Sequence, residues 1–170
     1  MTESAKTMGQ TLKAIKNNEG KYLMFTLAGE EYGVSILKIK EIIGMMPITS
    51  VPQTPEFVKG VINLRGRVIP VVDLRLRFLM DSTDHTDRTC IIVVETGGAV
   101  GTVQMGIVVD SVSEVLTIKG NDIEEAPKFG AKLDTEYILG MAKIDGGVKI
   151  LLDIDRVLSV DEINLLAEVA

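Results

Sequence analysis

Few side chains in this 170-residue chain could carry out catalysis or bind a metal. The single histidine, His85, lies between Asp84 and Asp87 in a polar stretch, where we expect a solvated imidazole rather than a general base in an enclosed site. The single cysteine, Cys90, begins an apolar run without a CxxC partner and is expected to be a small buried hydrophobe. One histidine and one cysteine do not make a zinc or di-iron site, so we expect neither a metal nor a cofactor.

The other patterns that could carry chemistry have simpler structural interpretations. The glycine-rich segment 97–101 lacks the Lys-Ser/Thr of a phosphate-binding loop and a following helix, so a hairpin loop is expected. Three acidic pairs fall at turns and strand ends, where solvated surface charge is expected rather than acid-base catalysis: Glu30-Glu31, Glu124-Glu125 and Asp153/Asp155. The sequence therefore predicts a binding protein and not an enzyme.

The composition narrows the class of partner. Hydrophobic residues make up 46% of the chain, enough for a sizeable core. The chain has 18 basic and 24 acidic residues, a net charge of −6, and only 4% aromatic residues, which argues against nucleic acid. It contains neither a signal peptide nor an apolar run of about 18 residues. We expect a cytoplasmic protein that contacts a membrane only through a partner.

The elements that must position any binding surface are mostly strands. Residues 1–20 have too few large apolar side chains for a core and are expected to form a flexible tail. From Lys21 onward, short runs rich in Val and Ile alternate with Gly, Asp, Asn and Pro, which is typical of a β-sandwich or barrel. Ten strands are expected, five on each side of a polar break at 80–87: 22–27, 31–34, 39–43, 58–64, 68–73, 89–95, 104–109, 112–118, 138–144 and 148–153.

Two segments have helical features. The apolar spacing of residues 36–43 suits a helix while their Ile content favours a strand, so we expect one helical turn running into a strand. Ser159 followed by Glu162 is a capping box, with apolar residues after it, and predicts a short helix over about 159–169 that docks on the barrels.

The chain contains an internal repeat. An offset of 80 aligns residues 60–74 with 140–154, and four of the fifteen positions are identical where ordinary composition gives about one. An offset of 73 aligns residues 33–42 with 106–115. Two copies of one small β unit explain both alignments. We expect barrel 1 over about 21–80 and barrel 2 over about 88–155, sharing a hydrophobic seam with a groove beside it that could hold a long partner element.

Equivalent turns follow from this repeat. Arg65-Gly66 and Asp145-Gly146 each lie between two apolar runs, where a tight hairpin needs a positive φ. A turn does not need an arginine, so Arg65 could pair with Glu41 near the seam and present donors to a partner, or it could be a solvated turn charge.

The apolar side chains beside the seam also leave two alternatives open. More of them are present than one small barrel can easily bury, so some could form an exposed binding patch, or all could be buried between the barrels. They are Ile36, Ile39, Ile42, Ile43, Met45, Met46 and Val51.

Three segments together resemble the CheW-like domain family. They are PEFVKGVINLRGRVIPVVDL over residues 55–74, EYGVSI over 31–36 and GIVVDSV over 106–112. The resemblance extends over about Lys21 to Leu166. It implies two five-stranded SH3-like barrels packed about a pseudo-twofold axis, with residues 21–170 as one CheW-like domain.

The resemblance also implies a function and its partners. A CheW-like adaptor would couple the cytoplasmic tip of methyl-accepting chemotaxis receptors to the regulatory domain of the histidine kinase CheA, at receptor arrays on the inner face of the membrane. The alternative is a CheW-like module that regulates a kinase in a non-flagellar pathway. Neither function requires catalysis.

Two sets of contact residues are implied by the same resemblance. The receptor tip would lie as a helix in a groove beside the seam. The expected receptor-binding residues are Ile36, Ile39, Glu41, Gly60, Asn63 and Arg65. The expected kinase-binding residues, assigned to the second barrel, are Gly106, Val108, Val112 and Val115.

Overall fold

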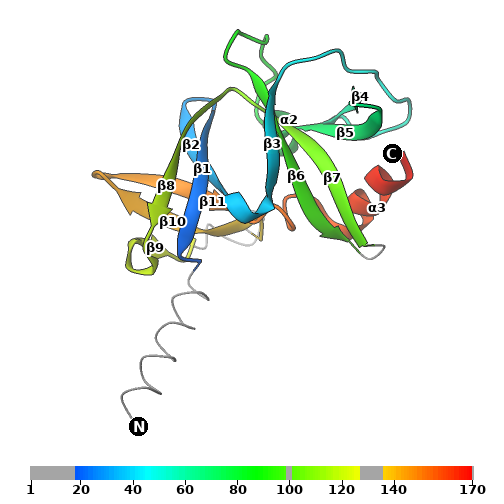
Figure 1. The fold of residues 1–170 in the computed structure, drawn as a ribbon. Coiled ribbons are helices and arrows are strands. Elements are labelled where there is room, and N and C mark those ends of the chain that lie inside the picture. The colour runs from blue at the N-terminus through cyan, green and yellow to red at the C-terminus, as the bar shows by residue number, and fades with distance from the viewer. Residues whose placement is uncertain (1–17, 99–100, 127–135, 170) are drawn as a thin grey trace.

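Two β-sheets form the body of the protein in a computed structural model that describes residues 18–98, 101–126 and 136–169 (Figure 1). The six-stranded sheet has the order β8 (Ser111–Ile118), β1 (Gly20–Leu27), β2 (Glu30–Ser35), β11 (Gly147–Leu152), β10 (Ile138–Ile144) and β9 (Ile123–Glu124). The five-stranded sheet has the order β3 (Ile39–Gly44), β6 (Cys90–Gly98), β7 (Gly101–Val109), β5 (Arg67–Asp73) and β4 (Val58–Leu64). Within the described residues, four short helices join the sheets: η1 (Ile36–Lys38), α2 (Leu74–Arg77), η2 (Gly120–Asp122) and α3 (Val160–Val169).

The predicted fold class is confirmed: the protein is all-β, with two barrel-like sheets and a short C-terminal helix. All ten expected strands are present, and the two-residue β9 is added to them. The expected tail at 1–20 falls almost entirely outside the described residues, which begin at Asn18. None of the helices in the described part of the chain is long and apolar enough to span a membrane.

The assignment of the barrels to two consecutive halves of the chain is wrong, because the halves exchange strands. The N-terminal β1 and β2 pair with β8 and β11, whereas β6 and β7 pair with β3 and β5. In Figure 1 the blue β1 and β2 therefore lie beside the orange β11, and the cyan β3 lies beside the green β6. Each sheet contains the first hairpin of one repeat and the later strands of the other.

The strand pairing shows the repeat directly. Gly33 of β2 lies opposite Leu151 of β11, and Gly106 of β7 lies opposite Val71 of β5, in the only two parallel pairings among the described strands. The two later hairpins also share their register, with a shift after Val58 in one and after Ile138 in the other. The offsets of 73 and 80 therefore mark equivalent positions in the two sheets.

The two hairpin turns also match. Arg65 and Asp145 have φ values of 53° and 51°, and the glycines that follow have φ values of 87° and 78°. Two consecutive residues with positive φ are the signature of the type I′ turn, whose twist fits the flanking strands. The role predicted for Gly66 and Gly146 is confirmed.

Three groups of buried side chains stabilise this arrangement. The largest contains residues from both sheets and from α3, including Phe25 of β1, Ile107 of β7 and Leu166 of α3. The other two groups belong to one sheet each, around Val71 in the five-stranded sheet and around Leu151 in the six-stranded sheet. The shared group is the predicted hydrophobic seam. Because the strands alternate, one face of each sheet lines this seam and the other lines its own small core.

Helix α3 begins at the predicted capping box. The Ser159 Oγ accepts a hydrogen bond from the Glu162 N–H at 3.1 Å, and the Glu162 carboxylate accepts one from the Ser159 N–H at 2.7 Å. Ile163 and Leu166 are buried in the seam. The helix therefore docks on the sheets as expected.

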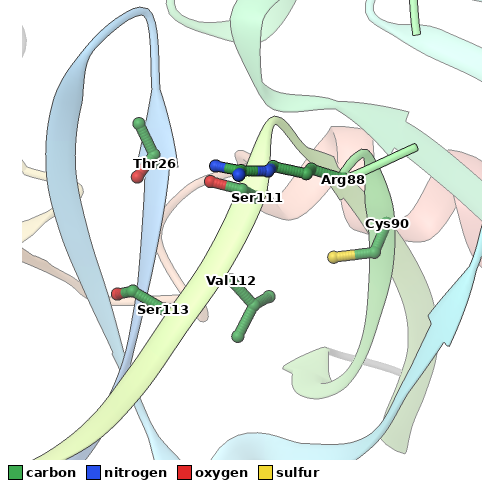
Figure 2. A pocket seen from close by; sticks show the side chains of 6 residues that line it. All are labelled: Thr26, Arg88, Cys90, Ser111, Val112 and Ser113. Atoms are coloured by element: carbon green, nitrogen blue, oxygen red, sulfur yellow. The ribbon is translucent and has the colours of Figure 1, made fainter. Parts of the chain in front are cut away.

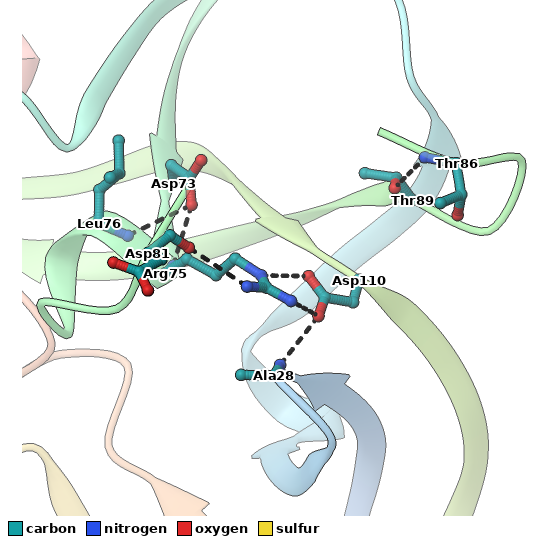
Figure 3. A network of polar contacts seen from close by, with 8 residues as sticks. All are labelled: Ala28, Asp73, Arg75, Leu76, Asp81, Thr86, Thr89 and Asp110. Atoms are coloured by element: carbon teal, nitrogen blue, oxygen red, sulfur yellow. Dashed lines mark hydrogen bonds and ion pairs between the residues drawn. The ribbon is translucent and has the colours of Figure 1, made fainter. Parts of the chain in front are cut away.

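Polar contacts cross the seam at two places. At one, Asp110 binds the guanidinium of Arg75 and accepts a hydrogen bond from the Ala28 N–H in the β1–β2 turn at 2.9 Å (Figure 3). At the other, Asp155 forms an ion pair with Lys38 at 2.7 Å and accepts a hydrogen bond from the Gly97 N–H at 3.0 Å. Each contact fixes the first hairpin of one repeat to the sheet that contains the other.

Candidate binding surfaces

An ion pair between Glu41 and Arg65 joins the two edges of the five-stranded sheet. Glu41 lies on the edge strand β3, and Arg65 lies in the turn after the opposite edge strand β4. A contact between the outer strands requires the sheet to curl on itself, as in a barrel. The ion pair was one of the two alternatives left open by the sequence, and the structure contains it. The Arg65 side chain is still 69% exposed, so its guanidinium remains available to a partner.

An apolar surface accompanies this ion pair. Ile36 and Leu37 of η1 are 40% and 89% exposed, and Ile42 of β3 is 46% exposed. Element η1 contacts both β1 and β6, so it lies at the seam. The predicted helical turn followed by a strand is confirmed at this place. The exposure of Leu37, which the sequence did not single out, results from the single turn of η1, which buries none of its own residues.

The other apolar residues near the seam are divided between core and surface. Ile39 is partly buried and packs against the seam core, whereas Ile43, Met45 and Met46 pack against the core of the five-stranded sheet. Part of the segment is therefore exposed, as the first alternative expected, and the alternative that all of it is buried between the barrels is wrong.

Two of the six expected receptor contacts have structural roles. Gly60 is buried at φ 143°, and a Cβ there would collide with the Thr49 carbonyl oxygen. The exposed Asn63 accepts a hydrogen bond from the Gly66 N–H at 2.8 Å and so orders the turn that carries Arg65. Gly60 has no surface to offer a partner, and Asn63 acts at least partly by positioning Arg65.

The four expected kinase contacts do not share one surface. Gly106 and Val108 are buried on β7 of the five-stranded sheet, and a Cβ at Gly106 would lie 2.6 Å from the Ile91 Cγ2. Val112 and Val115 lie on β8, an edge strand of the six-stranded sheet. Val112 is partly buried against the seam core, and Val115 is 48% exposed. The placement of all four in one barrel was wrong because β7 and β8 belong to different sheets.

An open pocket of about 570 Å³ lies between β1, β8 and the start of β6 (Figure 2). Thr26, Arg88, Cys90, Ser111, Val112 and Ser113 line it. Burial raises the pKa of the Cys90 thiol, which keeps it in the poorly nucleophilic protonated form. The sequence did not point to this pocket because its residues come from three segments that only the strand exchange brings together.

No cluster of three or more His, Cys, Asp or Glu side chains suited to a metal ion occurs among the described residues. Arranged as they are, the exposed apolar and charged groups of η1, β3, β8 and the β4–β5 turn can bind other macromolecules. Two barrels with separate exposed surfaces fit a protein of the adaptor class.

Comparison with known proteins identifies the particular family. The CheW-like domain model matches residues 21–162. The chain is similar to chemotaxis protein CheW of Klebsiella aerogenes, at 42% identity over 150 residues and 88% of either chain. It is also similar to chemotaxis protein CheW of Bacillus subtilis, at 38% identity over 122 residues, covering 72% of this chain and 74% of the relative. The chain belongs to the CheW-like domain family.

A solved structure supports the same assignment. The scaffolding protein TtCheW from Thermoanaerobacter tengcongensis matches with a TM-score of 0.74 and 37% identity, covering 85% of this chain and 95% of that one. Together with the curated relatives, it assigns the chain the role of a chemotaxis coupling adaptor.

Proposed function

We propose that this adaptor binds the cytoplasmic tip of methyl-accepting chemotaxis receptors with one surface and the regulatory domain of CheA with another, so that receptor state controls kinase activity. It acts by binding alone and catalyses no reaction. It works in the cytoplasm, at receptor arrays on the inner face of the membrane. The alternative, a module for a kinase in a non-flagellar pathway, is not favoured because the relatives compared above are chemotaxis proteins.

The observation that carries the receptor surface is the Arg65–Glu41 ion pair beside the exposed η1. A helix laid along this part of the seam would cover Ile36 and Leu37 and meet the Arg65 guanidinium. Arginine is one of the residue types enriched at the positions that dominate binding energy when a partner covers them. The proposed contact therefore consists of Ile36, Ile39, Glu41 and Arg65. Asn63 and Gly60 support it through their structural roles.

The kinase surface is centred on the edge strand β8. Val115 presents an exposed apolar side chain there, whereas Val112, nearer the start of the strand, packs against the seam core and is not part of the surface offered to CheA. The buried Gly106 and Val108 support this surface only by holding β7 in place. Two reversible contacts of about 1,200 Å² or less each would suffice, because repeated copies in an array gain avidity.

A co-sedimentation experiment tests whether the two surfaces act together. Membranes that contain receptor are mixed with CheA, with and without this protein, and the pelleted kinase is measured. We expect CheA to pellet efficiently only when the protein is present. Equal amounts of pelleted CheA with and without it would contradict the proposal.

A further inference from the structure

The cation at the mouth of the pocket between β1, β8 and β6 lacks a partner within the chain. The Arg88 guanidinium forms no hydrogen bond or ion pair with the part of the chain that the structure describes, and the same holds for the Thr26 and Ser111 hydroxyls. In Figure 2 the guanidinium extends toward Ser111, with Thr26 facing the same space. Three hydrogen-bonding groups thus converge on a pocket in a protein whose net charge is −6.

The internal repeat shows what occupies the equivalent place in the other half. Phe25 pairs with Val112 in one sheet as Val94 pairs with Ile39 in the other, which makes Thr26 equivalent to Glu95 and Ser113 equivalent to Lys40. Lys40 and Glu95 form an ion pair at 2.6 Å, and this contact lowers the pKa of Glu95. In the pocket, neutral hydroxyls replace both charged groups.

The lining favours a carboxylate over a phosphate. Arg88 is the only cationic side chain that lines the pocket, and a single guanidinium matches one carboxylate through two parallel hydrogen bonds. A phosphate carries nearly two negative charges and usually binds several cations or a row of backbone N–H groups. The Cβ-branched Val112 supplies an apolar wall that fits the stem of an acidic side chain rather than a free ion.

We propose that Arg88, with the Thr26 and Ser111 hydroxyls, is a subsite for an acidic side chain of the helical receptor tip. The pocket lies at the seam and shares Val112 with the seam core, so a helix in the proposed groove could reach it. This inference rests on the proposed function for the identity of the partner, but not for the anion preference of the pocket. The partner's carboxylate would take the place that Glu95 fills in the other half.

The anion preference can be tested without any partner, because Cys90 is the only cysteine and lines the same pocket. The reaction rates of Cys90 with an anionic sulfonate thiol reagent and with a cationic ammonium thiol reagent are compared in the full chain. We expect Arg88→Gln to lower the anionic-to-cationic rate ratio by about threefold or more, because the positive charge that attracts the anionic reagent is removed. Both reagents react with the same thiol, so the reactivity of the thiol itself cancels in the ratio. Lys119→Gln, which removes an exposed cation outside the pocket, is the matched control. An equal ratio in both variants would overturn the subsite.

The partner is tested by sedimentation of the full chain with receptor-containing membranes. We expect Arg88→Gln to weaken apparent affinity by about fivefold and to make it less sensitive to salt, while Lys119→Gln binds normally. Charge reversal identifies the partner group: Arg88→Glu should be rescued by changing one acidic residue of the receptor tip to Lys. Normal binding by Arg88→Gln would overturn the subsite and leave the proposed function intact. Failure of the unaltered protein to bind would contradict the proposed function and the receptor as occupant, while the thiol test would still decide the anion preference.

Discussion

Arg75 and Asp155 occupy equivalent positions of the internal repeat but carry opposite charges. Arg75 pairs with Asp110, whereas Asp155 pairs with Lys38, so the cation and the anion are exchanged between the two ends of the seam. In both places the carboxylate also accepts a hydrogen bond from the first hairpin of a repeat, from the Ala28 N–H in the β1–β2 turn or from the Gly97 N–H near the end of β6. The repeat has therefore kept the contact while changing which segment supplies the cation, which is α2 at Arg75 and η1 at Lys38. If each hairpin packed on its own half instead, the two cations would face each other and so would the two carboxylates. The exchange of charges therefore disfavours that arrangement.

The contact at Asp110 should contribute measurably to stability. Two hydrogen bonds at 2.8 and 2.5 Å join it to Arg75, whose side chain is only 18% exposed. We expect Asp110→Asn to lower the free energy of unfolding by about 1–2 kcal/mol, because a charge-assisted pair is lost in a partly buried place. Urea denaturation measures the change. Asp84→Asn, in the exposed polar loop, is the control, and an equal effect of both substitutions would contradict the role of the pair.

The same contact predicts a pH dependence. The hydrogen bonds from Arg75, assisted by the Ala28 N–H, hold the pKa of Asp110 below its ordinary value of 3.8. The stabilisation is therefore complete above the ordinary value and is lost as the pH falls through the lower value of the folded protein. We expect the difference in unfolding free energy between the unaltered protein and Asp110→Asn to be constant above about pH 5 and to shrink below 3.8. Denaturation over a pH series checks this, and a difference that grows in acid would show the opposite linkage.

Arg65 should affect coupling without affecting folding. Its side chain is exposed and its positive φ belongs to the turn rather than to the arginine itself. We expect Arg65→Glu to unfold at nearly the same urea concentration, within about 0.5 kcal/mol. Receptor-dependent activation of CheA should fall at least about tenfold, because the new carboxylate repels Glu41 and removes the donors offered to the receptor. Arg67→Glu, at the exposed first position of β5, is the control, and full activation by Arg65→Glu would remove Arg65 from the proposed surface.

Gly106 is expected to matter for stability and not for direct binding. A Cβ there would meet the Ile91 Cγ2 at 2.6 Å, so Gly106→Ala should destabilise the protein by about 1–3 kcal/mol. The Ile91→Ala change removes that methyl group. It should therefore lower the free energy of unfolding by less in the Gly106→Ala background than in the unaltered protein. A double-mutant cycle in urea measures this coupling. A stable Gly106→Ala protein that has lost only kinase binding would contradict this account.

The local structure was largely predictable because each of these sequence patterns is compatible with only one local conformation. Gly66 and Gly146 allowed a tight turn between apolar runs, and Ser159 with Glu162 closed a capping box. The repeat offsets identified equivalent strands correctly. Of the candidate site, the Arg65–Glu41 ion pair and the exposure of Ile36 were each one of two alternatives that the sequence left open, and the structure decides between them.

The strand exchange was not predictable from these signals. An offset shows which segments are equivalent, but equivalent segments can pair within a repeat or between repeats with the same local pattern. The choice depends on contacts distant in sequence, such as Asp110 with Ala28. For the same reason Gly106 and Val108 were placed in the second barrel, and the pocket at Arg88 was missed.

Reconstitution of kinase activity tests the coupling role most directly. Autophosphorylation of CheA is measured with receptor-containing membranes, with and without this protein, and with each component omitted in turn. We predict strong stimulation that requires all three components and that falls at least about tenfold with Arg65→Glu. Receptor-controlled CheA activity that is the same without this protein would contradict the coupling role.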